Sequence, residues 1–201
     1  MATLLHLDAS AAVEGSRSRA LTAAFAAAFA PGDTVVHRDL HAEPVPHLRD
    51  PELHWAAPLR MVQRDEDPVQ ERLVAELLGA DAVVIGYPLY NYSLPSSLKA
   101  WLDHVHVPGT TAGAVMPLAG KPAVLVTTRG GDYGPGGANA GRDLATPVLE
   151  LILGEEMGMD VTTVAVGFTL AKTPELLQRS ESEYAEALAT LEALGKRLGA
   201  E

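Results

Sequence analysis

Short apolar runs alternate with longer amphipathic stretches along the chain, an order that is typical of βαβ units and a parallel sheet. The apolar runs predict five strands, at Thr3–Asp8, Thr34–Arg38, Asp81–Gly86, Pro122–Thr127 and Val161–Val166. The amphipathic stretches predict five helices, at Ser16–Ala30, Asp67–Leu78, Pro95–His106, Asp143–Met157 and Pro174–Leu198. The unbroken apolar character of the third strand indicates burial on both faces of the sheet. We therefore expect an α/β fold, a doubly wound three-layer sandwich that forms a single domain over residues 1–201.

Residues 41–64 interrupt this regular order. The segment carries prolines at positions 44, 46, 51 and 58 and shows neither a helical nor a strand period. Proline fixes φ and lacks a backbone N–H, so several prolines in a short stretch oppose regular elements. We therefore expect a long loop there, with room for one short helix.

The charge balance of the chain is acidic. Lys and Arg number 15 against 26 Asp and Glu, which leaves a formal net charge of −11. Nucleic-acid binding depends on Lys and Arg that neutralise phosphates, so we expect no nucleic-acid partner. No uncharged apolar run reaches the roughly 18 residues that a membrane-spanning helix needs, so we expect no membrane-spanning segment. The absence of cysteine excludes disulfides, thiolate metal ligands and a cysteine nucleophile, and it is compatible with the cytoplasm as the expected location.

The residue spacing gives little support to a metal site or to a serine hydrolase. Seven histidines invite a search for a metal site. His37 and His41 lie at the end of a predicted strand, whereas His104 and His106 diverge on a predicted helix, and neither pair has a convincing third ligand. We therefore expect no metal site. A serine hydrolase is disfavoured as well, because the chain contains no G-x-S-x-G motif.

Ligands of an open parallel sheet bind beyond the carboxyl ends of its strands, so the loops that follow the strands are candidates for a site. The loop after the first strand offers Ser10, Ser16 and Ser18, together with Arg17, just before a helix. Serine hydroxyls and the unpaired N–H groups of a helix N-terminus can bind a phosphate group, and Arg17 would add positive charge. Alternatively, Ser16 serves only as the N-cap of this helix.

The loop after the third strand combines Pro88, Tyr90, Asn91 and Tyr92. Its tyrosines offer flat surfaces for a planar heteroaromatic ring, and Asn91 with neighbouring backbone amides can bind the polar edge of that ring. The alternative is that the prolines form turns and the tyrosines pack within the loop.

Lys99 and Asp103 lie four residues apart on the predicted helix that follows this loop. Residues at this spacing are neighbours on one helical face, where opposite charges attract. We expect the two side chains to pair with each other rather than to take part in catalysis.

The loop after the fourth strand contains the segment Thr128–Gly131, followed by Tyr133. Glycines let a main chain pass close to a flat ring and direct its N–H groups at an acceptor, where they would stabilise negative charge on the ring. A flexible turn explains the same glycines. Half of the ten aromatic residues lie within positions 87–133, namely Tyr87, Tyr90, Tyr92, Trp101 and Tyr133, and this clustering favours a ring site.

Taken together, the three loops resemble those of the FMN-dependent NADH:azoreductases, within the flavodoxin-like NAD(P)H:quinone oxidoreductases. The first-loop serine and the S-x-S motif of the family correspond to Ser10 and Ser16–Ser18. The motif P-[ML]-Y-N-[FY], followed by L-K and D, corresponds to Pro88–Tyr92 and then to Leu98, Lys99 and Asp103. The [ST]-R-G-G motif corresponds to Thr128–Gly131, and the three motifs follow one another in the order of the family.

The resemblance implies a flavodoxin-like sheet of five parallel strands in the order 2-1-3-4-5. It also implies a homodimer that binds one FMN per subunit in a crevice at the subunit interface. NADH or NADPH would reduce the flavin and leave, and a quinone or azo compound would then be reduced, which gives ping-pong turnover. The flavin carries the hydride chemistry in such a cycle, and the protein supplies position and electrostatics.

The resemblance also implies roles for the residues of the three loops. The phosphate and ribityl end of FMN would lie against Ser10, Ser16 and Ser18, while Arg17 either adds a phosphate contact or points to solvent. The ring would lie against the remaining motif residues, which are Pro88, Leu89, Tyr90, Asn91, Tyr92, Thr128, Arg129, Gly130 and Gly131. Tyr133 would assist protonation or shape the pocket.

Two further functions share this fold. One is a flavodoxin-type electron carrier, which would need a separate reductase, and the other is a homologue that binds no flavin. Residues 54–64 match no family pattern, and we expect the choice of acceptor and of NADH or NADPH to depend on them and on Gly109–Pro117. The sequence does not identify the physiological acceptor, and azo compounds could be incidental substrates of a quinone reductase.

Overall fold

The computed structural model of the chain describes residues 2–29, 32 and 34–200 and contains a five-stranded parallel sheet in the order β2-β1-β3-β4-β5. The strands are β1 Thr3–Asp8, β2 Thr34–Asp39, β3 Ala82–Pro88, β4 Pro122–Thr128 and β5 Asp160–Val166. All five predicted strands are present, and the predicted strand order and flavodoxin-like sandwich are confirmed. From β1 the chain adds β2 on one side of the sheet, and then β3, β4 and β5 on the other side. The strand order therefore reverses between β1 and β3.

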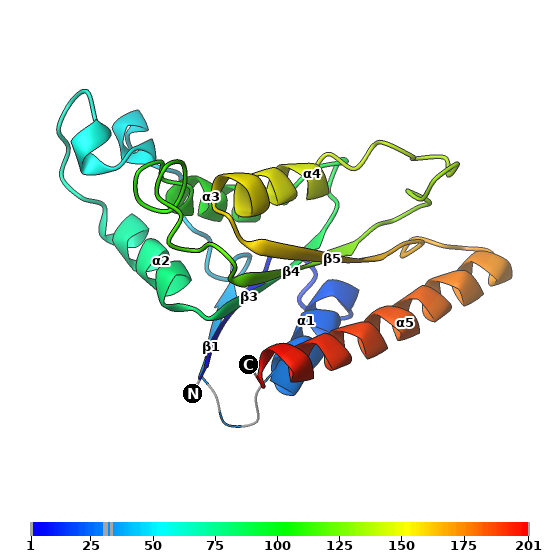
Figure 1. Ribbon diagram of the computed structural model, residues 1–201. Coiled ribbons are helices and arrows are strands. Elements are labelled where there is room, and N and C mark those ends of the chain that lie inside the picture. The colour runs from blue at the N-terminus through cyan, green and yellow to red at the C-terminus, as the bar shows by residue number, and fades with distance from the viewer. Residues whose placement is uncertain (1, 30–31, 33, 201) are drawn as a thin grey trace.

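Helices cover both faces of the sheet (Figure 1). One face carries α1 Arg17–Phe29 and α5 Pro174–Leu198, and the other carries α2 Pro68–Gly79, α3 Ser96–Val105, α4 Thr146–Leu149 and the π-helix η3 Glu150–Glu156. The prediction extends the first helix to Ala30, and this residue lies outside the described part of the chain, as does Pro31. None of the described helices combines the length and apolar character needed to cross a bilayer.

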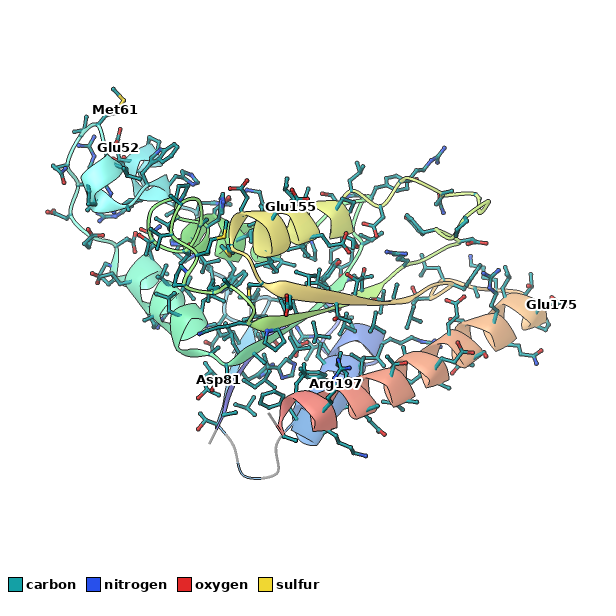
Figure 2. All side chains as sticks on the ribbon, viewed as in Figure 1. Glu52, Met61, Asp81, Glu155, Glu175 and Arg197 are labelled. Atoms are coloured by element: carbon teal, nitrogen blue, oxygen red, sulfur yellow. The ribbon has the colours of Figure 1, made fainter. Side chains whose placement is uncertain are left out.

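The two helical layers enclose two separate cores, and side chains fill both spaces between the layers (Figure 2). Successive residues of a strand point to opposite faces, so Leu4 joins Phe25 in one core while Leu5 joins Trp101 in the other. Residues 82–87 of the central strand β3 are all buried, as the unbroken apolar run predicts. The edge strand β2 is half-exposed, because it has a single neighbour in the sheet.

The helix predicted at 143–157 is present but begins later, at Thr146, and only its first four residues are α-helical. Asp143 lies before the helix, where its Oδ1 accepts hydrogen bonds from the N–H groups of Ala145 (3.0 Å) and Thr146 (2.9 Å). From Glu150 the chain continues as a π-helix, and the N–H of Met157 donates to the carbonyl of Ile152 five residues earlier, at 3.0 Å. The apolar spacing of Leu149 and Leu153 suits an α-helix equally well, which explains why the pattern did not distinguish the two.

Residues 41–64 form a long excursion with two 3₁₀-helices, η1 Pro51–His54 and η2 Ala57–Leu59, where one short helix was expected. Each begins with or contains proline in its first turn, where the missing N–H costs no hydrogen bond. Gln70 of α2 holds the excursion by donating to the carbonyls of Leu53 (2.8 Å) and His104 (3.2 Å). In Figure 1 the excursion, in cyan, lies at the opposite end of the molecule from the loop that follows β4.

Gly195 provides a test of the packing between α1 and α5. A Cβ at this position would come within 2.7 Å of the backbone oxygen of Phe25, an atom that cannot move aside without shifting α1. We expect Gly195→Ala to lower the free energy of unfolding by about 1–3 kcal/mol, as overpacking does. Gly79→Ala is the matched control, because its Cβ meets nothing within 4 Å and alanine favours a helix by up to about 1 kcal/mol.

Urea denaturation of both variants measures the difference. A Gly195→Ala protein that unfolds at the wild-type urea concentration would contradict the close packing of the two helices.

Candidate functional site

The loops that follow β1, β3 and β4 meet at the carboxyl edge of the sheet. The strand register places Asp8 beside Gly86 and Pro88 beside Thr128, so the three strands end together. The N–H of Leu89 donates to the carbonyl of Thr128 at 3.0 Å, which joins the second and third loops. The N–H of Ala11 donates to Oη of Tyr90 at 3.0 Å, which joins the first and second. The structure thus brings together the three segments that the sequence singles out.

A tight, strained turn shapes the second loop. Tyr90 and Ser93 exchange backbone hydrogen bonds of 3.1 and 3.0 Å, and the two residues between them, Asn91 and Tyr92, have φ values of 51° and 67°. These left-handed values at both central positions are those of a type I′ turn. Asparagine tolerates this conformation, whereas tyrosine does so at a cost of order 1–3 kcal/mol. Such strain is typical of a ligand-binding segment held in place by its surroundings.

The tyrosines of this turn are not buried packing residues. Tyr90 and Tyr92 leave 39% and 44% of their surfaces exposed. Tyr87 and Trp101, by contrast, are fully buried in the core, so only part of the aromatic cluster is available to a ligand. Burial raises the pKa of Tyr87 to about 12, and its hydroxyl shares a hydrogen bond of 2.9 Å with Thr146.

The third loop passes close to its neighbours at two glycines. A Cβ on Gly130 would lie 2.8 Å from Cδ1 of Leu170, and one on Gly131 would lie 2.8 Å from Nδ2 of Asn139. Within the described residues, the N–H groups of both glycines donate no hydrogen bond to the chain, and neither do those of Asn91 and Tyr92. Unpaired donors therefore line the rim of the site, where a ligand with acceptor atoms can satisfy them.

A cavity of about 460 Å³ opens between the second and third loops, and we call it the ring cavity. Nine of the predicted residues line it, which are Pro88, Leu89, Tyr90, Asn91, Tyr92, Thr128, Gly130, Gly131 and Tyr133. Asn139, Thr169 and Leu170 line it as well and were not predicted. Thr169 and Leu170 follow β5, and their N–H groups donate to the carbonyls of Arg129 (3.0 Å) and Gly130 (3.1 Å). The rule that directs attention to the carboxyl ends of the strands applies to β5 too and could have found them.

Arg129 supports the third loop from behind and does not line the ring cavity. Its guanidinium pairs with Asp143, the residue that also caps α4, and lies 5.8 Å from the ring centre of Tyr133. Burial raises the pKa of the Tyr133 hydroxyl above its usual value. Lys99 and Asp103 pair with each other on the outer side of α3, as their spacing predicts.

The first loop leads to the N-terminus of α1, where Ser16 is the N-cap. Its Oγ accepts from the N–H of Arg19 at 3.4 Å and lies 3.2 Å from Oγ of Ser18, which is buried. Ser10 is buried too, and its Oγ accepts from the N–H of Ala12 at 3.3 Å. The capping alternative is therefore present in the structure, and it leaves the hydroxyl hydrogen of Ser16 able to donate to a ligand.

A second opening of about 490 Å³ lies beside this helix N-terminus, lined by Val13, Gly15, Ser16, Arg17, Arg19, Ala20 and Tyr184. Arg17 reaches across it to α5, where Nη1 donates to the carbonyl and Oγ of Ser180, both at 3.1 Å, and Nη2 pairs with Glu181. The guanidinium also stacks on Tyr184, 5.1 Å from the ring centre. The Arg17 guanidinium is therefore paired with residues of α5 and does not project freely into solvent.

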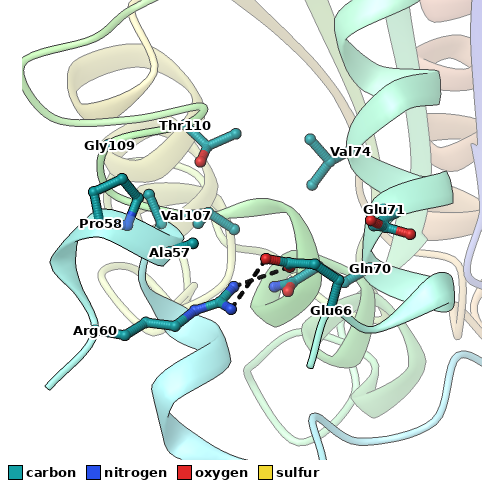
Figure 3. A pocket seen from close by; sticks show the side chains of 11 residues that line it. Ala57, Pro58, Arg60, Glu66, Gln70, Glu71, Val74, Val107, Gly109 and Thr110 are labelled. Carbon is teal, nitrogen blue, oxygen red and sulfur yellow. Dashed lines mark hydrogen bonds and ion pairs between the residues drawn. The ribbon is translucent and has the colours of Figure 1, made fainter. Parts of the chain in front are cut away.

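A third cavity, of about 340 Å³, lies under the 41–64 excursion (Figure 3). Arg60 crosses it and donates to both carboxylate oxygens of Glu66, at 3.2 and 3.1 Å. Residues 54–64 and 109–117, to which the sequence assigns selectivity, are all described, and none of them lines the ring cavity of the same chain. Within one chain, the expectation that they shape the acceptor site therefore has no support.

Asp143 tests how the third loop is held. Asp143→Asn keeps an oxygen that can cap α4 but removes the charge opposite Arg129, whereas Asp143→Ala removes both. We expect both variants to be destabilised, and the alanine variant by about 1 kcal/mol more, the usual value of a helix cap. Urea unfolding measures the difference, and equal unfolding free energies for the two variants would show that the cap contributes nothing.

Comparisons with known proteins identify the family of the chain. The model of the family described as having a flavodoxin-like fold matches residues 2–191. A protein of Kineococcus radiotolerans named FMN-dependent NADH:quinone oxidoreductase is 48% identical over 98% of this chain and 100% of its own. A protein of Streptomyces coelicolor with the same name is 39% identical over 100% of this chain and 99% of its own.

Solved structures show the same fold. An azoreductase from Bacillus anthracis has a TM-score of 0.81 at 24% identity, with 98% of this chain and 100% of that chain covered. A second protein from this organism, an FMN-dependent NADH-azoreductase in complex with FMN, has a TM-score of 0.74 at 18% identity, with 96% and 99% covered. The chain thus belongs to the flavodoxin-like family that includes the proteins named FMN-dependent NADH:quinone oxidoreductase.

Proposed function

We propose that this protein is an FMN-dependent oxidoreductase that takes electrons from NADH or NADPH and reduces a quinone or an azo compound. The observation that carries the proposal is the ring cavity at the carboxyl edge of the sheet, which is lined by half-exposed tyrosines and by residues whose backbone N–H groups are unpaired. The near relatives of the chain have names that state FMN and NADH as their cofactor and donor and quinones as their acceptors. Because NADH and NADPH are intracellular reductants, we also propose that the protein acts in the cytoplasm.

The residues present fit FMN at both of its ends. The ring cavity has a volume of about 460 Å³, and Gly130 and Gly131 line it without a side chain, so that a ring can approach the main chain there. The opening at the N-terminus of α1 offers helix N–H groups and the Ser16 hydroxyl to a phosphate. The hydrogen bond from Ala11 to Tyr90 joins these two regions, which suits one elongated ligand that spans both.

FMN supplies the hydride chemistry when it is bound. The N–H groups of Gly130 and Gly131 would face the edge of the ring where negative charge develops and would stabilise that charge. Tyr90 and Tyr92 would cover part of the ring and exclude water, and Asn91 would hold its polar edge. Tyr133 lines the ring cavity and would hold a proton at its hydroxyl, as a phenol does at neutral pH.

We further propose that donor and acceptor use the ring cavity in turn, in a ping-pong cycle. The cavity is lined by one set of loops, so donor and acceptor would occupy the same space in turn. Leu170 lines the cavity, and the N–H of Leu144 donates to the carbonyl of Tyr92 in its wall; these leucines leave 76% and 58% of their surfaces exposed. Exposed leucines of this kind favour a partner surface, so we propose a homodimer in which a second copy completes the wall of the site.

Anaerobic mixing tests the enzymatic activity. The FMN-loaded protein should lose its yellow absorbance on addition of NADH or NADPH, and a quinone or azo dye added afterwards should restore it without a second protein. Parallel runs with the two nucleotides give the donor preference. A protein that binds FMN but is reduced by neither nucleotide would contradict the proposal and would point to an electron carrier.

Three substitutions test the assignment of the ring cavity. Gly130→Val places a branched side chain against Leu170, and we expect it to weaken FMN binding at least about 10-fold, or 1.4 kcal/mol. Asn91→Gly suits the positive φ of this position and removes only the side chain, whereas Asn91→Ala also strains the turn. We therefore expect affinity to fall in the order wild type, Asn91→Gly, Asn91→Ala.

Fluorescence titration of the refolded or flavin-stripped protein with FMN measures these affinities. Gly79→Ala, far from the cavity on α2, is the control and should bind FMN as the wild type does. Wild-type FMN affinity in Gly130→Val and both Asn91 variants would mean that the ring binds elsewhere.

A further inference from the structure

Two histidines and an aspartate converge on the sheet face that α1 covers. His6 and Asp8 lie on β1, and His37 lies directly beside His6 on β2. Alternation along β1 sends Leu5 and Leu7 into the opposite core and leaves His6 and Asp8 on the same side. The two imidazole rings have their centres 4.5 Å apart. None of the three side chains lines the ring cavity, so the proposed oxidoreductase activity does not account for them.

The distances within this trio suit a metal ion. Nε2 of His37 lies 2.9 Å from Oδ2 of Asp8, Nε2 of His6 lies 3.3 Å from the same oxygen, and all three atoms lie within 4.8 Å of one another. Zinc binds imidazole nitrogen and carboxylate oxygen at about 2.0–2.2 Å, so two ligands at a tetrahedral angle are separated by about 3.3 Å. One ion can therefore reach all three atoms with small side-chain movements.

The buried nitrogen of His6 is the second observation that points to a ligand. His6 is 6% exposed, and its Nε2 forms no hydrogen bond with any described residue, despite lying near Asp8. A buried polar atom without a partner costs about 1–3 kcal/mol, so native structures rarely leave one unexplained. A metal ion bound to this lone pair would remove that cost.

The surroundings prepare the carboxylate for this role. Thr22 donates from Oγ1 to Oδ1 of Asp8 at 2.8 Å, which leaves Oδ2 turned toward the histidines. The His37 side chain is 48% exposed on the edge strand, which gives an ion access from solvent.

One nearby cation acts against metal binding. Nη1 of Arg19 lies 3.9 Å from Oδ2 of Asp8. The same guanidinium donates to both carboxylate oxygens of Asp39, at 2.6 and 2.8 Å, so its charge is largely balanced. The net charge near the trio therefore remains favourable to a cation.

We propose that His6, Asp8 and His37 bind one divalent transition-metal ion, with zinc as the best match, and that water completes its coordination. Two imidazoles and one carboxylate are a ligand set that zinc and its first-row neighbours accept. The ion would link the edge strand β2 to β1 just before the first loop. Arg19 also holds this loop, because it donates to the carbonyl of Ser10 at 2.6 Å. Its role is structural, and it takes no part in the transfer of electrons.

Calorimetric titration with zinc chloride tests the site. The full-length FMN-loaded protein is purified without a histidine tag and treated with a chelator before titration. We expect one zinc ion per chain, and we expect His37→Gln to weaken its binding at least about 10-fold. His47→Gln removes an exposed histidine of the 41–64 excursion and should leave the affinity unchanged.

Thermal unfolding gives an independent readout, because an ion that binds only the folded state raises the melting temperature in proportion to the logarithm of its concentration. Wild type and His47→Gln should show this rise and His37→Gln should show little of it. His37 is half-exposed, so its variant should fold, and retained FMN absorbance confirms this. A wild type that shows neither binding heat nor a thermal shift would overturn the proposal, and so would a His37→Gln variant that binds zinc as tightly as the wild type.

Discussion

The close approach of α1 to the middle of the sheet is the contact on which the rest of the site depends. It occurs at Gly86 of β3, where a Cβ would lie 2.7 Å from Cγ2 of Thr22 and 3.0 Å from Oδ1 of Asp8. Because glycine leaves this space free, α1 lies flat across β1 and β3 and its N-terminus reaches the carboxyl edge. The same approach brings the Thr22 hydroxyl onto Asp8, which orients the carboxylate beside the two histidines. A single missing methyl group thus positions both the helix end and the buried aspartate.

Part of the wall of the ring cavity is a strained turn that its neighbouring loops hold in place. The turn at Asn91 and Tyr92 holds two residues in left-handed conformations, which would relax in an isolated loop. Hydrogen bonds from outside the turn oppose that relaxation: the N–H of Leu144 donates to the carbonyl of Tyr92 at 2.9 Å, and Tyr90 receives the N–H of Ala11. The turn is therefore held by the loops on either side of it, although the N–H groups of Asn91 and Tyr92 themselves donate no hydrogen bond to any described residue.

The chain has a formal net charge of −11, so a phosphate group would be repelled by the protein as a whole. Three arginines of the site loops are already paired, Arg17 with Glu181, Arg19 with Asp39 and Arg129 with Asp143. An anion at the first loop would therefore depend on backbone N–H groups, the partial positive charge of the α1 N-terminus and serine hydroxyls. This arrangement makes net charge a poor guide to ligands, because fixed dipoles at short range act where the summed charge of the surface does not.

The sequence by itself determined the five strands, the order of the layers and most of the residues that line the ring cavity. Apolar periodicity reports burial locally, and glycine, proline and asparagine report backbone conformation locally, so both can be read from neighbouring residues. Only the tertiary structure decided three features: the π-helix Glu150–Glu156, the contribution of Thr169 and Leu170 to the ring cavity, and the contact between His6 and His37. These features depend on strand register and on helix packing between segments far apart in the chain, and no local pattern carries that information.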